Sequence, residues 1–201
     1  MRDDAPSAVI VVPTLCADRA AKTAALAQMT AGMECAAIII CDYKRRGDIK
    51  PANPALEAAL ALGAPYIVFL SDDVAVKQEH WLVRMIEVLE ADPSFGIAAP
   101  SGNCRGGPQM RGRPGDPRGH QVVSQPLAWF LAVIKREVFE QVGLFDENLI
   151  HYAGDTDLSR RAHKAGWKSV WVKDVYVEHD LGQPIEEWWQ HDVGYCGRKH
   201  G

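Results

Sequence analysis

Two adjacent carboxylates, Asp72 and Asp73, directly follow a short apolar run at residues 67–70 and Ser71. Such a run, bounded by turn residues, predicts a buried strand, with the carboxylates at its C-terminal end. In open α/β sheets, ligands bind at that edge. Adjacent negative charges are costly unless they are solvated, paired or bound to a cation. The pair indicates either a solvated acidic turn that caps the next helix, or a Mg²⁺ or Mn²⁺ ion shared with a phosphorylated ligand.

A second acidic group, Asp155 and Asp157, falls at the expected start of a helix. One aspartate there is explained as a helix cap, worth about 1 kcal/mol. Two carboxylates exceed what one cap needs, and a carboxylate that faces a ligand can act as a general base on an acceptor hydroxyl. His179 ends the last apolar strand beside two acids, where an imidazole is either structural or completes a metal shell.

The elements that must position these groups alternate regularly in the first half of the chain. Apolar runs predict buried strands at 8–12, 36–40, 67–70 and 96–100, and helices are expected between them. Asn53 and Pro54 are interpreted as the N-cap and first position of the second helix. This order predicts a mostly parallel sheet with helices on both faces.

The second half of the chain is less regular. Residues 101–120 are rich in Gly, Pro and Arg, which predicts a lid, a binding loop or a mobile surface segment with solvated arginines. Beyond them we expect short strands at 122–123, 129–134, 170–172 and 175–177, and helices at 136–142 and from Asp157 to Gly166. A last helix is expected from Gln183–Pro184, followed by a basic tail at 194–201.

Composition limits the class of protein. The 201 residues suit one domain, and the 22 basic and 26 acidic side chains give a net charge of −4. This balance argues against binding of nucleic acid or of an anionic membrane through the overall charge of the chain. The 5 cysteines show no zinc or CxxC spacing, so free thiols are expected. With no apolar run of about 20 residues and no signal-peptide pattern, we expect a cytoplasmic protein, with peripheral membrane association left open.

The ordered set of motifs resembles the family 2 glycosyltransferases, which have the GT-A fold of nucleotide-diphospho-sugar transferases. Ser71-Asp72-Asp73 falls where that family carries its DxD metal motif. The stretch from Lys135 to Glu147 is similar to the family's "rrevfe.vGgfDe" segment. Residues 154–167 look like its "EDxDlslR…aGw" segment. The resemblance extends from Val9 to about Gly182.

The resemblance implies a single domain, 1–201. Its expected parts are a nucleotide-binding half at 1–100, a flexible loop at 101–120, an acceptor and catalytic half at 121–182, and a C-terminal helix and tail at 183–201. It implies that Asp155 is the catalytic base. The ligands that it implies for Mn²⁺ or Mg²⁺ are Asp73, Asp72 and His179. The nucleotide-binding residues that it implies are Pro13, Thr14, Asp42, Ser71 and Asp72. On the acceptor side it implies Trp129, Asp157 and Arg160.

The activity that the resemblance implies is a metal-dependent, inverting hexosyl transfer from a nucleotide-diphosphate sugar. The acceptor is a hydroxyl on a glycan, a lipid-linked saccharide or a protein. The QxxRW arginine of processive members is missing at 183–188, which favours one transfer per binding event.

Two departures from the family pattern leave an alternative open. Ser71 replaces an acid and Gly154 replaces a glutamate, so a degenerate domain that binds nucleotide-sugar without turnover is the second interpretation. A sugar-phosphate nucleotidyltransferase is disfavoured because residues 13–18 contain no glycine for a phosphate loop. A phospho-receiver switch domain is disfavoured because the first strand is not followed by an acidic pair.

Overall fold

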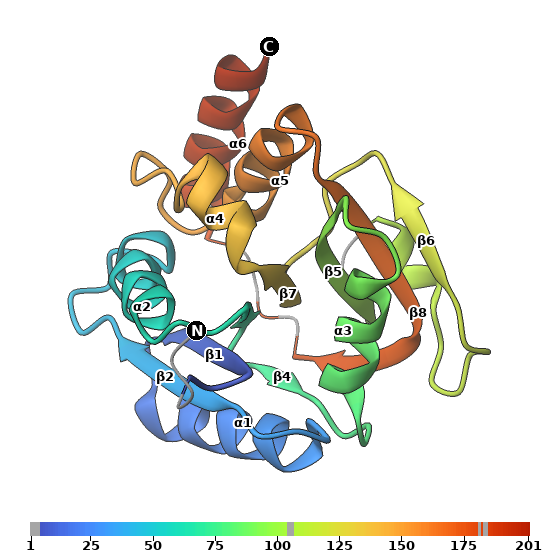
Figure 1. Ribbon diagram of the computed structural model, residues 1–201. Helices are drawn as coiled ribbons and strands as arrows, with labels where there is room; N and C mark the ends of the chain where they lie inside the picture. The colour runs from blue at the N-terminus through green and yellow to red at the C-terminus, as the bar shows by residue number, and fades with distance from the viewer. Residues whose placement is uncertain (1–4, 104–106, 181, 183–184) are drawn as a thin grey trace.

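The computed structural model describes residues 5–103, 107–180, 182 and 185–201. Within them, one eight-stranded sheet has the order β2-β1-β3-β7-β5-β8-β4, and β6 also pairs with β8 (Figure 1). Five strands run in one direction: β1 (Ala8–Thr14), β2 (Ala36–Cys41), β3 (Tyr66–Leu70), β5 (Phe95–Gly102) and β8 (Lys168–His179). Three run the opposite way: β4 (Val74–Ala75), β6 (His120–Val123) and β7 (Leu131–Lys135).

Helices cover both faces of this sheet (Figure 1). Successive side chains of a strand point to opposite faces, so Ile10 and Val12 pack on one side and Val9 and Val11 on the other. The first side holds α1 (Ala17–Thr30) and α3 (Trp81–Glu90). The second holds α2 (Ile49–Ala61), α4 (Arg136–Val142) and α5 (Gly154–Lys164), and α6 (Glu186–His200) packs on α5. The prediction of a mostly parallel sheet between helices is confirmed.

The start of α2 differs from its prediction. The helix begins at Ile49, and Pro54 lies inside it. Asn53 does not cap the helix, because its side chain is used across the fold: Nδ2 donates to the Phe145 carbonyl at 3.0 Å, and Oδ1 accepts the Phe145 N–H at 3.1 Å. These buried bonds tie α2 to the segment before α5.

Residues 101–120 also contain more regular structure than their composition indicates. Ser101 and Gly102 extend β5, and Pro108–Arg111 forms a 3₁₀ helix, η1. Gln109 is fully buried, and its Nε2 donates to the carbonyls of Pro100 and Ala128. Arg105, one of the arginines expected in this loop, lies outside the described residues.

Two further elements differ from expectation near the C-terminus. The two short strands expected at 170–177 form one strand, β8, which pairs with β5 through an irregular register. The expected basic tail is helical, since α6 continues through Gly194 to His200. The predicted helix start at Gln183 and Pro184 lies outside the described residues.

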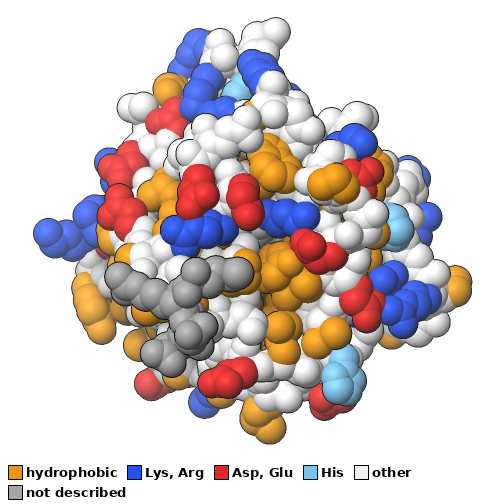
Figure 2. All heavy atoms as spheres, viewed as in Figure 1, with side chains coloured by type: hydrophobic (Ala, Val, Ile, Leu, Met, Phe, Trp, Pro, Cys, Tyr) orange, Lys and Arg blue, Asp and Glu red, His pale blue; other side chains and the backbone are white. Residues whose placement is uncertain are grey.

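The surface has mixed charge. Figure 2 shows acidic and basic side chains interspersed over the face viewed, without a large basic patch on that face. Among the described residues, no helix is both long and apolar enough to cross a bilayer.

Candidate active site

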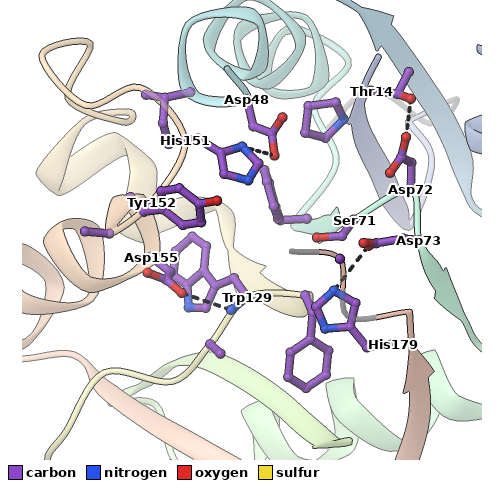
Figure 3. Close-up of a pocket in the computed structure, with 18 of the residues that line it drawn as sticks. Thr14, Asp48, Ser71, Asp72, Asp73, Trp129, His151, Tyr152, Asp155 and His179 are labelled. Atoms are coloured by element: carbon purple, nitrogen blue, oxygen red, sulfur yellow. Dashed lines mark hydrogen bonds and ion pairs between the residues drawn. The ribbon is translucent and has the colours of Figure 1, made fainter. Parts of the chain in front are cut away.

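A cavity of about 710 Å³ opens at one edge of the sheet (Figure 3). The parallel strands β1, β3 and β8 all end at this edge, and the antiparallel strand β7 begins there. Residues just beyond these four strand ends therefore meet although they are far apart in sequence. The cavity brings together eight of the predicted site residues: Pro13, Thr14, Ser71, Asp72, Asp73, Trp129, Asp155 and His179.

Asp73 and His179 form a carboxylate–imidazole pair on one wall. Val74 pairs with His179 across β4 and β8, which places Asp73 beside the ring. His179 Nε2 lies 3.2 Å from Asp73 Oδ1, and the ring stacks on Phe130 with centroids 5.4 Å apart. His179 Nδ1 is buried without a hydrogen-bond partner in the described chain.

Asp72 points the other way, toward β1 and α1. Thr14 Oγ1 donates to its Oδ2, and Arg19 Nη2 lies 2.8 Å from both carboxylate oxygens. The pKa of Arg19 is raised, chiefly by the hydrogen bond to Asp72. Arg19 was missed from sequence, although an arginine in the first turn of the helix after β1 is placed to reach this edge.

The donor set can be tested against a divalent metal. The described residues contain no cluster of three or more His, Cys, Asp or Glu that could hold an ion by themselves. Asp73 and His179 supply one oxygen and one nitrogen ligand beside an open cavity. Such a set suits Mn²⁺ or Mg²⁺ where phosphates and water complete the coordination.

Asp155 lies in the first turn of α5 and faces the same cavity (Figure 3). Its Oδ1 accepts the Thr156 N–H at 2.6 Å, and its Oδ2 accepts the Trp129 N–H at 3.3 Å. The Asp155 side chain lines the cavity and is partly exposed, with protein atoms around the rest of it. Burial raises the pKa of Asp155 above its usual 3.8, against the lowering effect of these N–H donors. A carboxylate with a raised pKa is a stronger proton acceptor.

Trp129 lines the cavity, but its side chain is almost entirely buried beneath the cavity surface. The side chain is 4% exposed and packs in an aromatic cluster with Phe69 and Phe145, at centroid distances of 6.5 and 5.9 Å. Its Nε1 is buried with no hydrogen-bond partner among the described residues. The ring is therefore mainly a core residue whose edge reaches the cavity.

Asp42 does not line the cavity. It follows β2 and is buried, and its carboxylate accepts the backbone N–H groups of Lys44 and Arg46. Its visible role is to hold the turn after β2.

Asp157 and Arg160 also lie outside the cavity lining. Asp157 is fully buried and pairs with Arg161 at 2.8 Å, not with Arg160, because residues four apart share a helix face. It also contacts Lys199 and His200, each at 2.7 Å, so it fastens α6 to α5.

A second carboxylate–imidazole pair, Asp48 and His151, lies on the opposite wall (Figure 3). Neither residue was singled out from sequence. Asp48 precedes α2, and His151 lies in the segment before α5, so only the long-range contact between these segments reveals the pair.

Comparison with known proteins agrees with this architecture. No protein-family model matches the chain. A curated relative from Mycobacterium tuberculosis, N-acetylglucosaminyl-diphospho-decaprenol L-rhamnosyltransferase, is 41% identical over 58 residues. That match covers 27% of this chain and 19% of the relative's length.

Two solved glycosyltransferases resemble the whole structure. Mannosyltransferase PcManGT from Pyrobaculum calidifontis, in complex with GDP-Man and Mn²⁺, has a TM-score of 0.68 and 17% identity, over 98% of this chain and 65% of that one. GalNAc-T7 with UDP, GalNAc and Mn²⁺ has a TM-score of 0.61 and 12% identity, over 88% and 44%. The sheet order, the cavity at the strand ends and these two structures together show that the chain has the GT-A fold of glycosyltransferases.

Proposed function

We propose that this chain is a metal-dependent, inverting glycosyltransferase that makes one transfer per bound donor. The observation that carries the proposal is the content of one cavity. A carboxylate–imidazole pair, Asp73 and His179, and a carboxylate of raised pKa, Asp155, line it together. The first is suited to a metal that accompanies a diphosphate, and the second to taking a proton.

The donor is a nucleotide-diphosphate sugar. Its nucleotide binds along Pro13, Thr14 and Ser71, where β1 and β3 end. Asp73 and His179 would hold Mn²⁺ or Mg²⁺, and such an ion would supply positive charge that neutralises the leaving diphosphate. The two solved structures described above hold Mn²⁺, one with GDP-Man and the other with UDP and GalNAc, which supports this assignment.

The transfer step uses Asp155 as the general base. Its carboxylate takes the proton of an acceptor hydroxyl while that oxygen bonds to the anomeric carbon of the sugar. The bond from this carbon to the diphosphate oxygen breaks, and the nucleoside diphosphate leaves with the bonding electrons. Attack from the face opposite the leaving group inverts the anomeric configuration.

The acceptor is a hydroxyl of a glycan, a lipid-linked saccharide or a protein. The absence of the QxxRW arginine at 183–188 supports a single transfer. We place the protein in the cytoplasm, either free or peripheral to a membrane, because four cysteines are free thiols: Cys16, Cys35, Cys41 and Cys196.

The test is turnover of a panel of nucleotide-diphosphate sugars with Mn²⁺, followed by proton NMR of the anomeric signal. Asp155→Asn should lower turnover by about a hundredfold or more while donor binding is retained, because the general base is lost. Asp18→Asn, on the exposed start of α1, is the matched control and should behave as wild type. Near-normal turnover by Asp155→Asn would refute the base assignment. Donor binding with no turnover of any donor would establish the degenerate interpretation instead.

A further inference from the structure

The charges that line the cavity are unbalanced. Five carboxylates face it, and the basic side chains among its described lining residues are three: Arg19, His151 and His179. Arg19 is already held by both oxygens of Asp72, and His179 lies against Asp73. A diphosphate that enters this cavity needs cationic partners, and His151 is the basic residue on the wall opposite His179.

His151 is fixed by contacts between the two halves of the fold. Its Nδ1 lies 3.0 Å from Asp48 Oδ2, at the start of α2, which is an ion-pair distance without hydrogen-bond geometry. The backbone is joined next to this pair, since the Ile49 N–H donates to the Ile150 carbonyl at 3.2 Å. Gly47 has φ +93°, and a Cβ there would lie 2.1 Å from the same carbonyl oxygen. The approach of these two segments therefore depends on a glycine.

A buried carboxylate on α6 binds the backbone of residues 150–152, the segment that carries His151. Asp192 is fully buried and accepts the backbone N–H groups of Ile150, His151 and Tyr152 at 2.9, 2.8 and 2.8 Å. The His151 ring packs edge-on against Tyr152, with centroids 4.5 Å apart. Figure 3 shows the ring between Asp48 and Tyr152, inside the cavity.

One atom of this fixed ring is available to a ligand. The His151 side chain is 33% exposed and lines the cavity, so the edge of the ring that carries Nε2, the nitrogen not facing Asp48, can meet a ligand. Burial lowers the pKa of His151, but the Asp48 contact and the charges of Asp192 and Asp73 outweigh it, so the pKa is raised above its usual 6.5.

We propose that His151 is a donor-binding residue whose protonated Nε2–H contacts the diphosphate from the wall opposite Asp73 and His179, and that Asp48 positions it. This inference rests on the proposed function, because it concerns the same donor. It assigns the leaving diphosphate a protein-derived cation that is present with or without a metal. Asp48 acts through His151 and has no direct role in the transfer.

The test is calorimetric titration with the nucleoside diphosphate that the wild-type protein binds, and with the corresponding nucleoside, in Mn²⁺ and in EDTA. His151→Gln should weaken diphosphate binding about tenfold in both buffers, as expected for one charge-assisted contact, and leave nucleoside binding unchanged. His151→Arg should keep the affinity within about threefold because the positive charge is retained. His191→Gln is the matched control: His191 also contacts Asp192 but does not line the cavity.

Measuring diphosphate affinity over a pH series separates the effect of the His151 charge from the effect of its packing. Wild-type affinity should fall as the pH rises through the pKa of His151, and His151→Arg should remove this fall. Asp48→Asn should move it to lower pH, since the raising contact is lost. The phosphate groups of the ligand also titrate, equally for all variants. The pH series of His151→Gln measures this contribution, which is then subtracted from the other series.

The outcomes distinguish this inference from the proposed function. Wild-type protein that binds no nucleoside diphosphate would overturn both. Wild-type binding with equal affinity in His151→Gln would overturn this inference alone. A parallel loss of nucleoside binding would show a structural role and overturn it too. If His151→Gln fails to fold, His151→Arg and Asp48→Asn give the same decision through the pH series.

Discussion

The contact between Asp192 and the 150–152 backbone makes a quantitative prediction about the cavity wall. The change is Asp192→Ala. It removes the carboxylate that accepts three backbone N–H groups from a helix, α6, about 40 residues away in sequence. Because His151 lies on this segment, the change should affect both stability and ligand binding.

The magnitude follows from the bonds lost. Three hydrogen bonds to a charged acceptor, at about 1.5 kcal/mol each, the low end of the range for such bonds, sum to about 4.5 kcal/mol. The three residues are partly exposed, so water recovers part of this, and removal of a buried charge offsets more. We expect a loss of about 3 kcal/mol in the free energy of unfolding. For a chain of this length each kcal/mol lowers Tm by about 2–4 °C, so Tm should fall by about 6–12 °C.

The assay is urea unfolding followed by circular dichroism, with Glu187→Ala on the exposed first turn of α6 as control. Asp192→Asn, which keeps one acceptor oxygen, should lose about half as much as Asp192→Ala. Nucleoside diphosphate binding should weaken in Asp192→Ala at temperatures where it is folded. A loss below about 1 kcal/mol, similar to Glu187→Ala, would refute the account of this wall.

Two further predictions concern the base and the glycine contact. Asp155 must be ionised to accept a proton, and its pKa is raised. We therefore expect kcat/KM to reach its maximum above that raised pKa and to fall as the pH drops through it. A pH–rate profile with its acid limb at or below pH 3.8 would contradict this. Gly47→Ala should destabilise the fold by about 2–4 kcal/mol, because a left-handed backbone and a clash with a backbone oxygen add. Gly115→Ala, at φ +81° in open space, should show only the backbone strain, and equal losses in urea unfolding would refute the clash.

The first half of the fold could be predicted because its information is local. The β1, β2 and β3 strands are continuous apolar runs, and such runs identify parallel strands without knowledge of their neighbours. The expectation that all three are buried is confirmed for β1 and β3 but wrong for β2, which lies at the edge of the sheet and is only partly buried. The meeting of Asp73 with His179 follows from the same reasoning, because residues after parallel strands share one edge of the sheet.

The remaining features depend on contacts that no local pattern encodes. The β7 strand lies between β3 and β5 and pairs antiparallel with both, and the sequence of β7 does not specify which strands it pairs with. Asn53 has the residue type of a helix cap, but tertiary bonds to Phe145 use its side chain instead. Asp157 has the position of an active-site acid, but α6 supplies partners that turn it into a structural residue.

The most direct test of the central claim is thermal melting with a panel of nucleoside diphosphates, with and without Mn²⁺. A ligand that binds only the folded protein raises Tm by mass action. One diphosphate should raise Tm more with Mn²⁺ than without it, and Asp73→Asn should remove the Mn²⁺-dependent part, because Asp73 is assigned to the metal. No rise with any nucleotide at millimolar concentration, with Mn²⁺ present, would contradict the assignment of this cavity to a nucleotide-sugar donor.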